Sequence, residues 1–297
     1  MQLTYFIEAA NQLSMSAAAD ELRVAQSAVS ASIAQLESLV GAQLFIRRRS
    51  KGLVLTGAGE RLLLDSTGLL SQLDEALDAA RGVDSQVRGV VRIACFVTLA
   101  PFILPGLLSE VAERFPRLIV DVVEVDAEGA RDELRRGGVE MAITYGFALG
   151  SDIVTEVVSA AKPYAVLPAQ HPLAQQPSVA LHQLAHEKLV LLDLPHSREY
   201  FLGILASAGI EPNIRYRSSS YETVRALVAR GHGYSILNQR PVPHETYDGG
   251  QVAMIEISDA IEPLPIMLAS LASVRSTARA RAVADCLRDV LPASQHP

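Results

Sequence analysis

Residues 24–37, VAQSAVSASIAQLE, limit the fold strongly, because they form a helix pattern with one apolar face and one uncharged polar face. Val29, Ile33, Leu36 and Val40 recur at intervals of four, three and four residues, which predicts one buried helix face. The opposite face carries short hydrogen-bonding side chains, namely Gln26, Ser27, Ser30, Ser32 and Gln35. Solubilising Lys and Glu are missing from it until Glu37, so we expect this face to contact a partner rather than water.

A second helix precedes this segment after a short break. The run SAAADEL can be capped by Ser14 or Ser16, and its three consecutive alanines allow a neighbouring helix to approach closely. Residues 23–25 separate the two helices. A small-residue helix, a tight turn and a helix with a polar outer face are typical of a helix-turn-helix. The helix that begins near Gln26 would then be the recognition helix, and Gln suits adenine in the major groove.

Positive charge gathers beside the predicted helix-turn-helix. Between residues 23 and 61 six cations stand against two anions, a local net charge of +4 in a chain of net charge −7. The run IRRRSKG followed by LVLT predicts a two-stranded wing with a basic tip, which fits contact with phosphates or the minor groove. A solvated charge run is the alternative. The expected contact residues are Arg23, Arg47, Arg48, Arg49 and Lys51.

The segment from Phe6 to Gly59 resembles the LysR-type transcriptional regulators in its motifs SMSAAA, VAQSAVS, LE, LF, RR and LTGAG, with the family's spacings between them. One departure concerns the recognition helix. Members of the family often carry Arg or Lys just after the position of Ser30 and about three residues later, where this chain has Ala31, Ser32 and Ala34. Phosphate binding is therefore expected to rest on the wing and on Arg23.

A long helix is expected from about Ala58 to Arg81, with Thr56 as its cap. Its leucines step by three and four residues in a short heptad pattern, which favours pairing with a second chain; a helix packed on its own domain would look similar. The expected seam leucines are Leu63, Leu70, Leu73 and Leu77. The polar stretch VDSQVRG follows as a hinge, which gives a DNA-binding domain at 1–57, a linker at 58–89 and an effector domain at 90–297.

From Val90 onward, short β-branched runs alternate with amphipathic helices, a pattern that predicts an α/β fold with mostly parallel sheets. The expected strands are 90–96, 118–125, 141–146, 162–168, 188–193, 213–219 and 234–238. The resemblance implies two α/β subdomains joined by crossing strands, similar to periplasmic binding proteins. Residues 91–161 and 267–297 would form one subdomain, and residues 162–266 the other.

Candidate effector residues follow the strands, because ligands of open α/β sheets bind beyond the carboxyl ends of the strands. Hydroxyl groups at helix starts favour an anion, and Arg198 could bind a carboxylate through two hydrogen bonds. For Thr98, Ser197 and Ser220, plain helix capping is the alternative. The candidates are Phe96, Val97, Thr98, Tyr145, Phe147, His196, Ser197, Arg198, Ser219, Ser220 and Tyr221.

Several classes of function find no support in the sequence. It has no nucleophile elbow and no dinucleotide fingerprint. His182 and His186 could share a metal, but they lack the Glu of a zincin and a third ligand. Cys95 is expected to be a buried structural thiol. The resemblance implies that disulfide-based peroxide sensing would need a cysteine pair in the second subdomain, and residues 162–266 contain none. No cofactor, secretory signal or membrane span is expected, and the expected location is cytoplasmic.

These patterns predict a DNA-binding regulator rather than an enzyme. Its expected partners are double-stranded DNA with a pseudo-palindromic site, a small anionic effector between the subdomains, and a second copy of the chain. The resemblance also implies a homotetramer and contact with RNA polymerase. The alternative is a regulator without an effector, whose C-terminal domain serves only oligomerisation.

Overall fold

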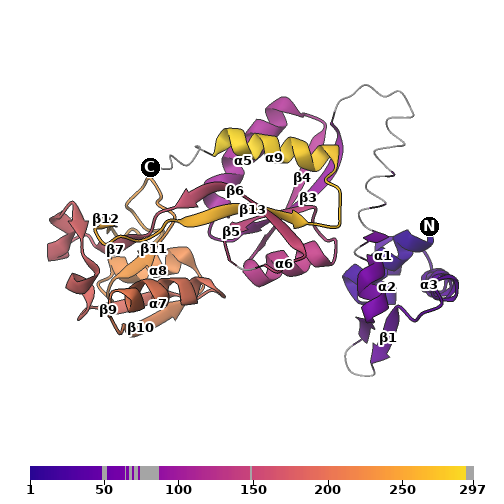
Figure 1. Ribbon diagram of the computed structural model, residues 1–297, viewed down its shortest axis with the longest axis horizontal. Coiled ribbons are helices and arrows are strands. Elements are labelled where there is room, and N and C mark those ends of the chain that lie inside the picture. Colours follow the sequence, from indigo (N-terminus) through magenta and orange to yellow (C-terminus); the bar gives the residue numbers. More distant parts are fainter. Residues whose placement is uncertain are drawn as a thin grey trace.

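The computed structural model describes residues 1–48, 52–63, 65–66, 69, 73, 87–147 and 149–291 of the chain. The N-terminal part has the predicted winged helix-turn-helix order (Figure 1). Its elements are α1 (Gln2–Gln12), α2 (Met15–Glu21), α3 (Gln26–Val40), β1 (Phe45–Arg48) and β2 (Gly52–Leu55). Strands β1 and β2 pair antiparallel, so the wing predicted from the arginine run is present.

Helix α2 packs closely on its neighbours because its inward side chains are small. Ala18 and Ala19 are buried, and the Ser14 hydroxyl accepts a hydrogen bond from the Ala17 amide at 3.2 Å, which makes Ser14 the cap. The chain leaves α2 through Arg23, whose φ of 53° is left-handed. The Val24 amide then donates to the Ala19 carbonyl at 2.9 Å, and α3 begins two residues later.

Glu37 joins the recognition helix to the wing. Its carboxylate accepts hydrogen bonds from the backbone amides of Leu44 and Phe45, at 2.7 and 3.2 Å. Phe45 in turn packs against Phe6 of α1, with 5.4 Å between the ring centroids. A single carboxylate therefore helps to hold the wing, α3 and α1 in one unit.

The buried face of α3 is shorter than its spacing predicted. Val29, Ile33 and Leu36 lie in the core of the domain, as expected. Val40 does not: it is 45% exposed, because it is the last residue of α3 and the left-handed Gly41 turns the chain at that point.

The first turns of the helix that follows the wing pack against the N-terminal domain. The Thr56 hydroxyl accepts from the Gly59 amide at 3.0 Å, which confirms the predicted cap. Leu63, expected in the dimer seam, is only 1% exposed and lies in the core of the N-terminal domain, so that assignment is wrong. Leu73 is helical and 51% exposed. Leu70 and Leu77 lie outside the described residues.

A five-stranded sheet forms the first half of the C-terminal region, in the order β4-β3-β5-β13-β6. Helices α5 and α9 cover one face and α6 covers the other (Figure 1). The elements are β3 (Gly89–Phe96), α5 (Ala100–Arg114), β4 (Leu118–Val125), α6 (Ala127–Arg135), β5 (Met141–Tyr145), β6 (Ile153–Ala161), β13 (Leu264–Leu271) and α9 (Ala278–Val290).

The prediction of mostly parallel strands is only partly right for this sheet. Strand β3 pairs parallel with β4 and β5, but β13 pairs antiparallel with both β5 and β6. The reason is topological: β13 returns from the second half, and it therefore enters the sheet against the direction of β5.

The second half contains two further groups of strands. One sheet has the order β11-β7-β12-β8, and β9 pairs parallel with β10. A parallel bridge between Leu189 and Tyr234 connects the two groups. The elements are β7 (Tyr164–Pro168), η1 (Pro172–Gln175), β8 (Ser178–Val179), η2 (Leu181–Leu184), β9 (Lys188–Leu192), α7 (Ser197–Ser207), β10 (Asn213–Ser218), α8 (Tyr221–Ala229), β11 (Ser235–Leu237) and β12 (Val252–Ile257).

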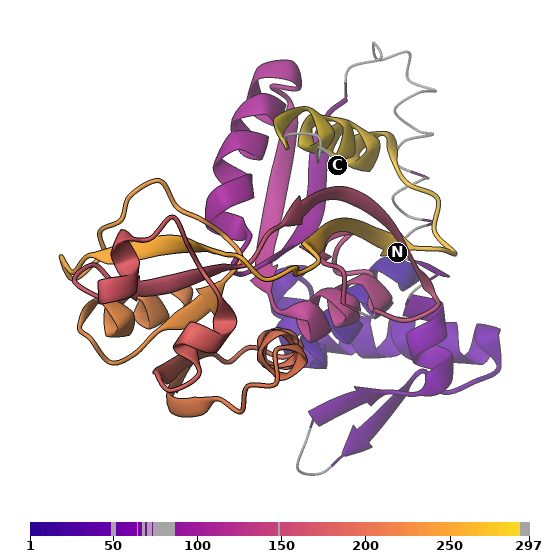
Figure 2. The same ribbon diagram turned by 60° about the vertical axis from the view of Figure 1, so that its left-hand side comes forward.

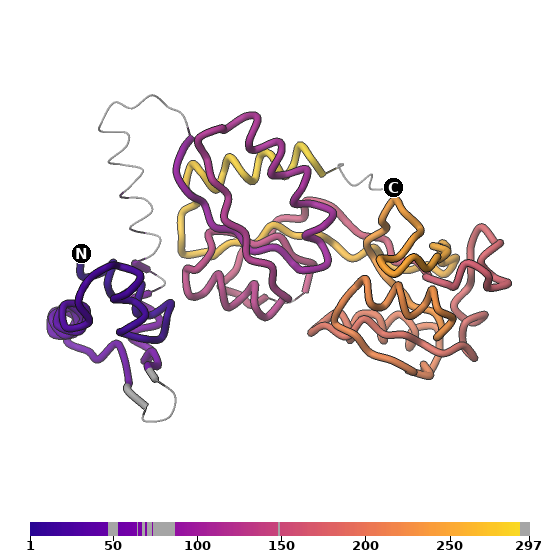
Figure 3. Tube along the Cα trace, turned by 180° about the vertical axis from the view of Figure 1, so that it is seen from behind, coloured from indigo at the N-terminus to yellow at the C-terminus, as the bar shows by residue number. Residues whose placement is uncertain are grey.

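Two extended segments pass between the halves, from β6 into β7 and from β12 into β13 (Figures 2 and 3). One hydrophobic cluster includes residues of both halves, among them Phe96 and Tyr145 of the first and Tyr164 and Phe201 of the second. The halves are thus packed together where the crossing strands meet, and the expected two-subdomain architecture is confirmed.

The turn between α8 and β11 requires glycine at two positions. Gly231 has a φ of 78° and Gly233 a φ of 140°, both left-handed values that favour glycine. At Gly233 the backbone also approaches β9, and a Cβ there would lie 1.9 Å from the Lys188 carbonyl oxygen. This carbonyl accepts the Tyr234 amide at 2.9 Å, so the close approach holds β11 beside β9.

We expect Gly233→Ala to destabilise the protein far more than Gly231→Ala. Gly231 has open space around a Cβ, so its replacement costs about 1 kcal/mol in backbone conformation. At Gly233 the clash with backbone adds to that cost, for a total of about 3 kcal/mol. Urea unfolding followed by circular dichroism compares the two variants, and equal losses would contradict the close approach.

Candidate DNA-binding face and effector cleft

The polar face of α3 is available for DNA. Gln26 and Ser27 are exposed in its first turn, while Ser30 and Ser32 are half-buried. Gln35 is exposed and accepts a hydrogen bond from the Gln2 side chain at 3.2 Å, so α1 orients it.

Three of the predicted cations fall within the described residues, one before α3 and two on β1. Arg23 is exposed in the turn before α3. Arg47 and Arg48 stand on β1, paired in register with Leu53 and Gly52. Arg49 and Lys51 lie outside the described residues. The helix-turn-helix and the wing are therefore present, and the contacts of these cations with phosphates stay a prediction.

A cleft site forms where strands of the two halves end opposite one another. Tyr145 ends β5, and Thr98 follows β3; the Thr98 hydroxyl donates to the Tyr145 hydroxyl at 3.5 Å. Ser197 begins α7 after β9, and Tyr221 begins α8 after β10. Because the carboxyl ends of these strands meet, the expected residues Thr98, Tyr145, Ser197 and Tyr221 come together.

The space between these side chains is nearly filled. The cavity measures about 10 Å³, which is room for about one water molecule. Burial raises the pKa of Tyr145 to about 12, so this hydroxyl stays protonated and neutral at physiological pH. The residues that line the cavity are Thr98, Tyr145, Leu192, Ser197, Phe201, Tyr221, Asn238 and Gln239.

Gln239 joins the two halves across this cavity, although its position in the sequence gave no sign of that role. Its side-chain amide donates to the Tyr145 hydroxyl of the first half at 3.2 Å. Its backbone carbonyl accepts from the Tyr164 hydroxyl at 2.5 Å and from the Tyr221 hydroxyl, both of the second half. Tyr164 and Tyr221 also contact each other at 3.0 Å between their oxygens. Burial raises the pKa of both phenols, so they remain donors.

Of the predicted aromatic residues, Tyr145 and Tyr221 line the cavity, whereas Phe96 and Phe147 do not. Phe96 is fully buried and packs against Tyr145, with 5.1 Å between the ring centroids. Phe147 stacks on His196 at 5.8 Å, and His196 has a left-handed φ of 63°. Val97 is half-buried and its amide donates to the Val125 carbonyl. These residues shape the first half of the cleft, and Phe147 contacts the second half through His196.

Three of the predicted effector residues are placed elsewhere. Arg198 pairs with Asp193 at 3.3 Å and with Glu199 at 3.2 Å, and it does not line the cavity, so its role as a carboxylate clamp stays a prediction. Ser219 and Ser220 are exposed, and the Ser220 hydroxyl accepts from the Thr223 amide at 3.3 Å. Ser220 therefore caps α8, which was the alternative interpretation.

The two cysteines and the paired histidines take part in no metal-binding cluster among the described residues. Cys95 and Cys286 are both buried free thiols, and burial raises the pKa of Cys95 to about 12, with the nearby Glu124 adding to the shift. His182 lies on η2 and His186 follows it, and no group of three metal-ligating side chains occurs among the described residues. Among the same residues, no helix has the length and apolar character to cross a membrane.

A winged helix-turn-helix joined to a two-part α/β domain with a polar cleft defines a DNA-binding regulator of the kind that carries a ligand-binding domain. Residues 1–60 match the family described as bacterial regulatory helix-turn-helix proteins of the lysR family. Residues 84–292 match the LysR substrate binding domain. The chain therefore belongs to the LysR family, and it is a DNA-binding transcriptional regulator with a substrate-binding domain.

Several known proteins are similar to this chain over most of its length. The uncharacterized HTH-type regulator YnfL of Escherichia coli is 31% identical over 79% of this chain and 80% of its own length. A probable hydrogen peroxide-inducible genes activator of Mycobacterium avium is 32% identical over 82% of this chain and 78% of its own. The crystal structure of HinK from Pseudomonas aeruginosa superposes with a TM-score of 0.67 at 32% identity, covering 97% of this chain and 96% of that one.

Replacing Gln26 with Ala is expected to relax sequence preference without loss of stability, because Gln26 is exposed and a lost base contact is worth about 1–3 kcal/mol of discrimination. Binding of a randomised DNA library followed by sequencing measures the preference. Ser38→Ala, on the exposed far end of the same helix, is the control. An unchanged preference in the Gln26 variant would contradict the assignment of α3 as recognition helix.

The Cys95 thiol is expected to resist alkylation in the folded protein. A pKa near 12 in place of 9.0 lowers the thiolate fraction at pH 8. Iodoacetamide should therefore react roughly a thousandfold more slowly than in the denatured chain. Mass spectrometry of native and guanidinium-treated samples checks this, and rapid native labelling of Cys95 would contradict the buried, unreactive assignment.

Proposed function

We propose that a small carboxylate effector binds in the cleft and changes how the two halves are arranged. The observation that carries this proposal is that hydroxyl and amide groups from both halves line the same small cavity. Thr98 and Tyr145 come from the first half, and Ser197, Tyr221 and Gln239 come from the second. Such polar groups at opposing strand ends are typical of ligand sites in open α/β folds.

Neutral donors, rather than a cation, would hold the carboxylate. No charged side chain is among the described residues that line the cavity, and Arg198 pairs instead with Asp193 and Glu199. The support for an anion is Ser197, whose hydroxyl and backbone stand in the first turn of the eleven-residue helix α7. Helix N-termini stabilise negative charge through their free amides and their dipole.

The size of the cavity indicates how the effector would act. A volume of about 10 Å³ excludes a metabolite, so binding requires the halves to separate. Separation breaks the contact between the Gln239 amide and Tyr145, and the effector's own hydrogen bonds replace it. Regulation follows if the effector binds the open arrangement more tightly than the closed one, with typical coupling of about 1–3 kcal/mol.

We further propose that the chain acts as a homodimer, with the division 1–57, 58–89 and 90–297 for DNA binding, linkage and effector binding. Leu69 and Leu73 support it, because both are helical, stand four residues apart in the chain and are 60% and 51% exposed. Pairing along these leucines presents two α3 helices to a pseudo-palindromic site. Two dimers would complete the tetramer, which meets RNA polymerase on bound DNA.

Thermal unfolding against a library of small carboxylates tests the effector proposal. A true effector should raise the melting temperature saturably, since a ligand at 100 times its Kd stabilises by about 2.7 kcal/mol. Thr98→Val and Ser197→Ala should each weaken the response at least tenfold, because each removes one hydroxyl from the lining. Arg198→Gln is the matched control and should keep the full response.

Loss of the response in Arg198→Gln alone would contradict the site. A response that neither Thr98→Val nor Ser197→Ala weakens would place the ligand elsewhere. No response to any carboxylate would favour the regulator without an effector, whose C-terminal domain only oligomerises.

A further inference from the structure

A second and much larger cavity lies on the other side of Asn238 and Gln239. Its volume is about 410 Å³, within the range of cavities that take metabolite-sized ligands. Asn238 and Gln239 line both this cavity and the small cleft cavity, so they form the wall between them. The crossing segment from β6 to β7, at residues 159–163, forms part of the opposite side.

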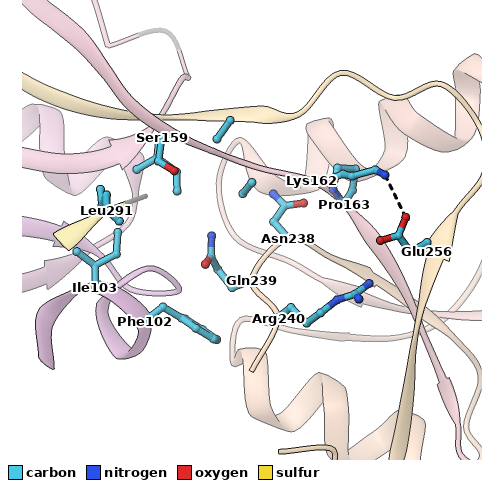
Figure 4. A pocket seen from close by; sticks show the side chains of 13 residues that line it. Phe102, Ile103, Ser159, Lys162, Pro163, Asn238, Gln239, Arg240, Glu256 and Leu291 are labelled. Carbon is cyan, nitrogen blue, oxygen red and sulfur yellow. Dashed lines mark hydrogen bonds and ion pairs between the residues drawn. The ribbon is translucent and has the colours of Figure 1, made fainter. Parts of the chain in front are cut away.

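The lining is divided into an apolar end and a charged end. Figure 4 shows Phe102, Ile103 and Leu291 at one end, and Lys162, Glu256 and Arg240 at the other. Ile103 is buried in the hydrophobic core, and the Phe102 ring packs edge-on against Tyr221 at 5.9 Å. The apolar end is therefore built on α5 and on the end of α9.

The charged end has one cation more than it has anions. Lys162 pairs with Glu256 at 3.2 Å, and these two charges compensate each other. Arg240 lies over the Tyr164 ring, 4.8 Å from its centroid, and it has no carboxylate partner among the described residues. Stacking on Tyr164 orients the guanidinium while its hydrogen-bond donors stay available.

We propose that this cavity is a second ligand site, distinct from the cleft, for an amphipathic monocarboxylate. The carboxylate binds Arg240, whose planar guanidinium matches two carboxylate oxygens. The apolar ring or chain of the ligand lies along Phe102, Ile103 and Leu291. The single uncompensated positive charge selects one anionic group, and the separation of the two ends selects an elongated molecule.

Occupancy of this site acts on the cleft through Gln239. Its side chain lines the large cavity, yet its amide donates to Tyr145, which lines the small one. A ligand that contacts Gln239 changes this hydrogen bond and hence the contact that joins the halves. By linkage, the two sites then affect each other's affinity equally.

Calorimetric titration of the full-length protein with 2-naphthoate tests the proposal, with the neutral isostere 2-naphthamide in parallel. Naphthoate should bind saturably with a Kd below about 1 mM. Naphthamide, which lacks the charge, should bind about tenfold more weakly. Arg240→Gln should weaken naphthoate binding by the same factor.

Arg215→Gln is the matched control, because Arg215 also stacks on a tyrosine, 5.3 Å from the Tyr216 centroid, but lines neither cavity. It should leave naphthoate binding unchanged. The cleft variants Thr98→Val and Ser197→Ala should also retain it, which separates this proposal from the proposed effector site.

Three results would overturn the second site. The first is no saturable naphthoate binding up to about 10 mM. The second is binding that Arg240→Gln leaves intact. The third is binding lost in Ser197→Ala but not in Arg240→Gln, which would place naphthoate in the cleft.

Discussion

The antiparallel pairing of β13 with β5 and β6 is the constraint on which the C-terminal region depends. Strand β13 follows the whole second half in the chain, yet it lies inside the first sheet between β5 and β6. It pairs with β6 from Leu264 to Leu271, with one register shift between Ile266 and Met267. This insertion makes the second half an excursion between β6 and β13. It therefore produces two crossing segments, and with them the cleft and the cavities beside them.

Because two extended segments connect the halves, the halves lie side by side, and the strand ends of one half face those of the other. Gln239 makes a polar contact across the cleft. Its side chain contacts Tyr145 of the first half, and its carbonyl accepts from Tyr164 and Tyr221 of the second. A contact made by one residue between two rigid units is well suited to regulation, since a ligand has to replace only a few hydrogen bonds to change their arrangement.

The N-terminal domain shows which structural features can be predicted from short-range sequence patterns. Helix α3, the Ser14 cap, the Thr56 cap and the wing all follow from spacing and turn chemistry within a few residues. Val40 and Leu63 had the right spacing but the wrong surroundings. Spacing predicts which side chains share a helix face, but chain packing decides what that face contacts. Val40 stands at the end of α3 and is exposed, whereas Leu63 is buried in the core of the N-terminal domain.

The sequence by itself determined the DNA-binding unit, the change to an α/β pattern near Val90, and the strand ends that supply Thr98, Tyr145, Ser197 and Tyr221. These features depend on hydrogen bonds and periodicities over short stretches of chain, which the order of residues encodes directly. Tertiary structure alone decided that Arg198 pairs with Asp193, that Gln239 joins the halves, and that Arg240 stands at the charged end of a large cavity. Charge pairing and cavity shape arise between segments far apart in the chain, and such proximity exists only once β13 has brought the two halves together.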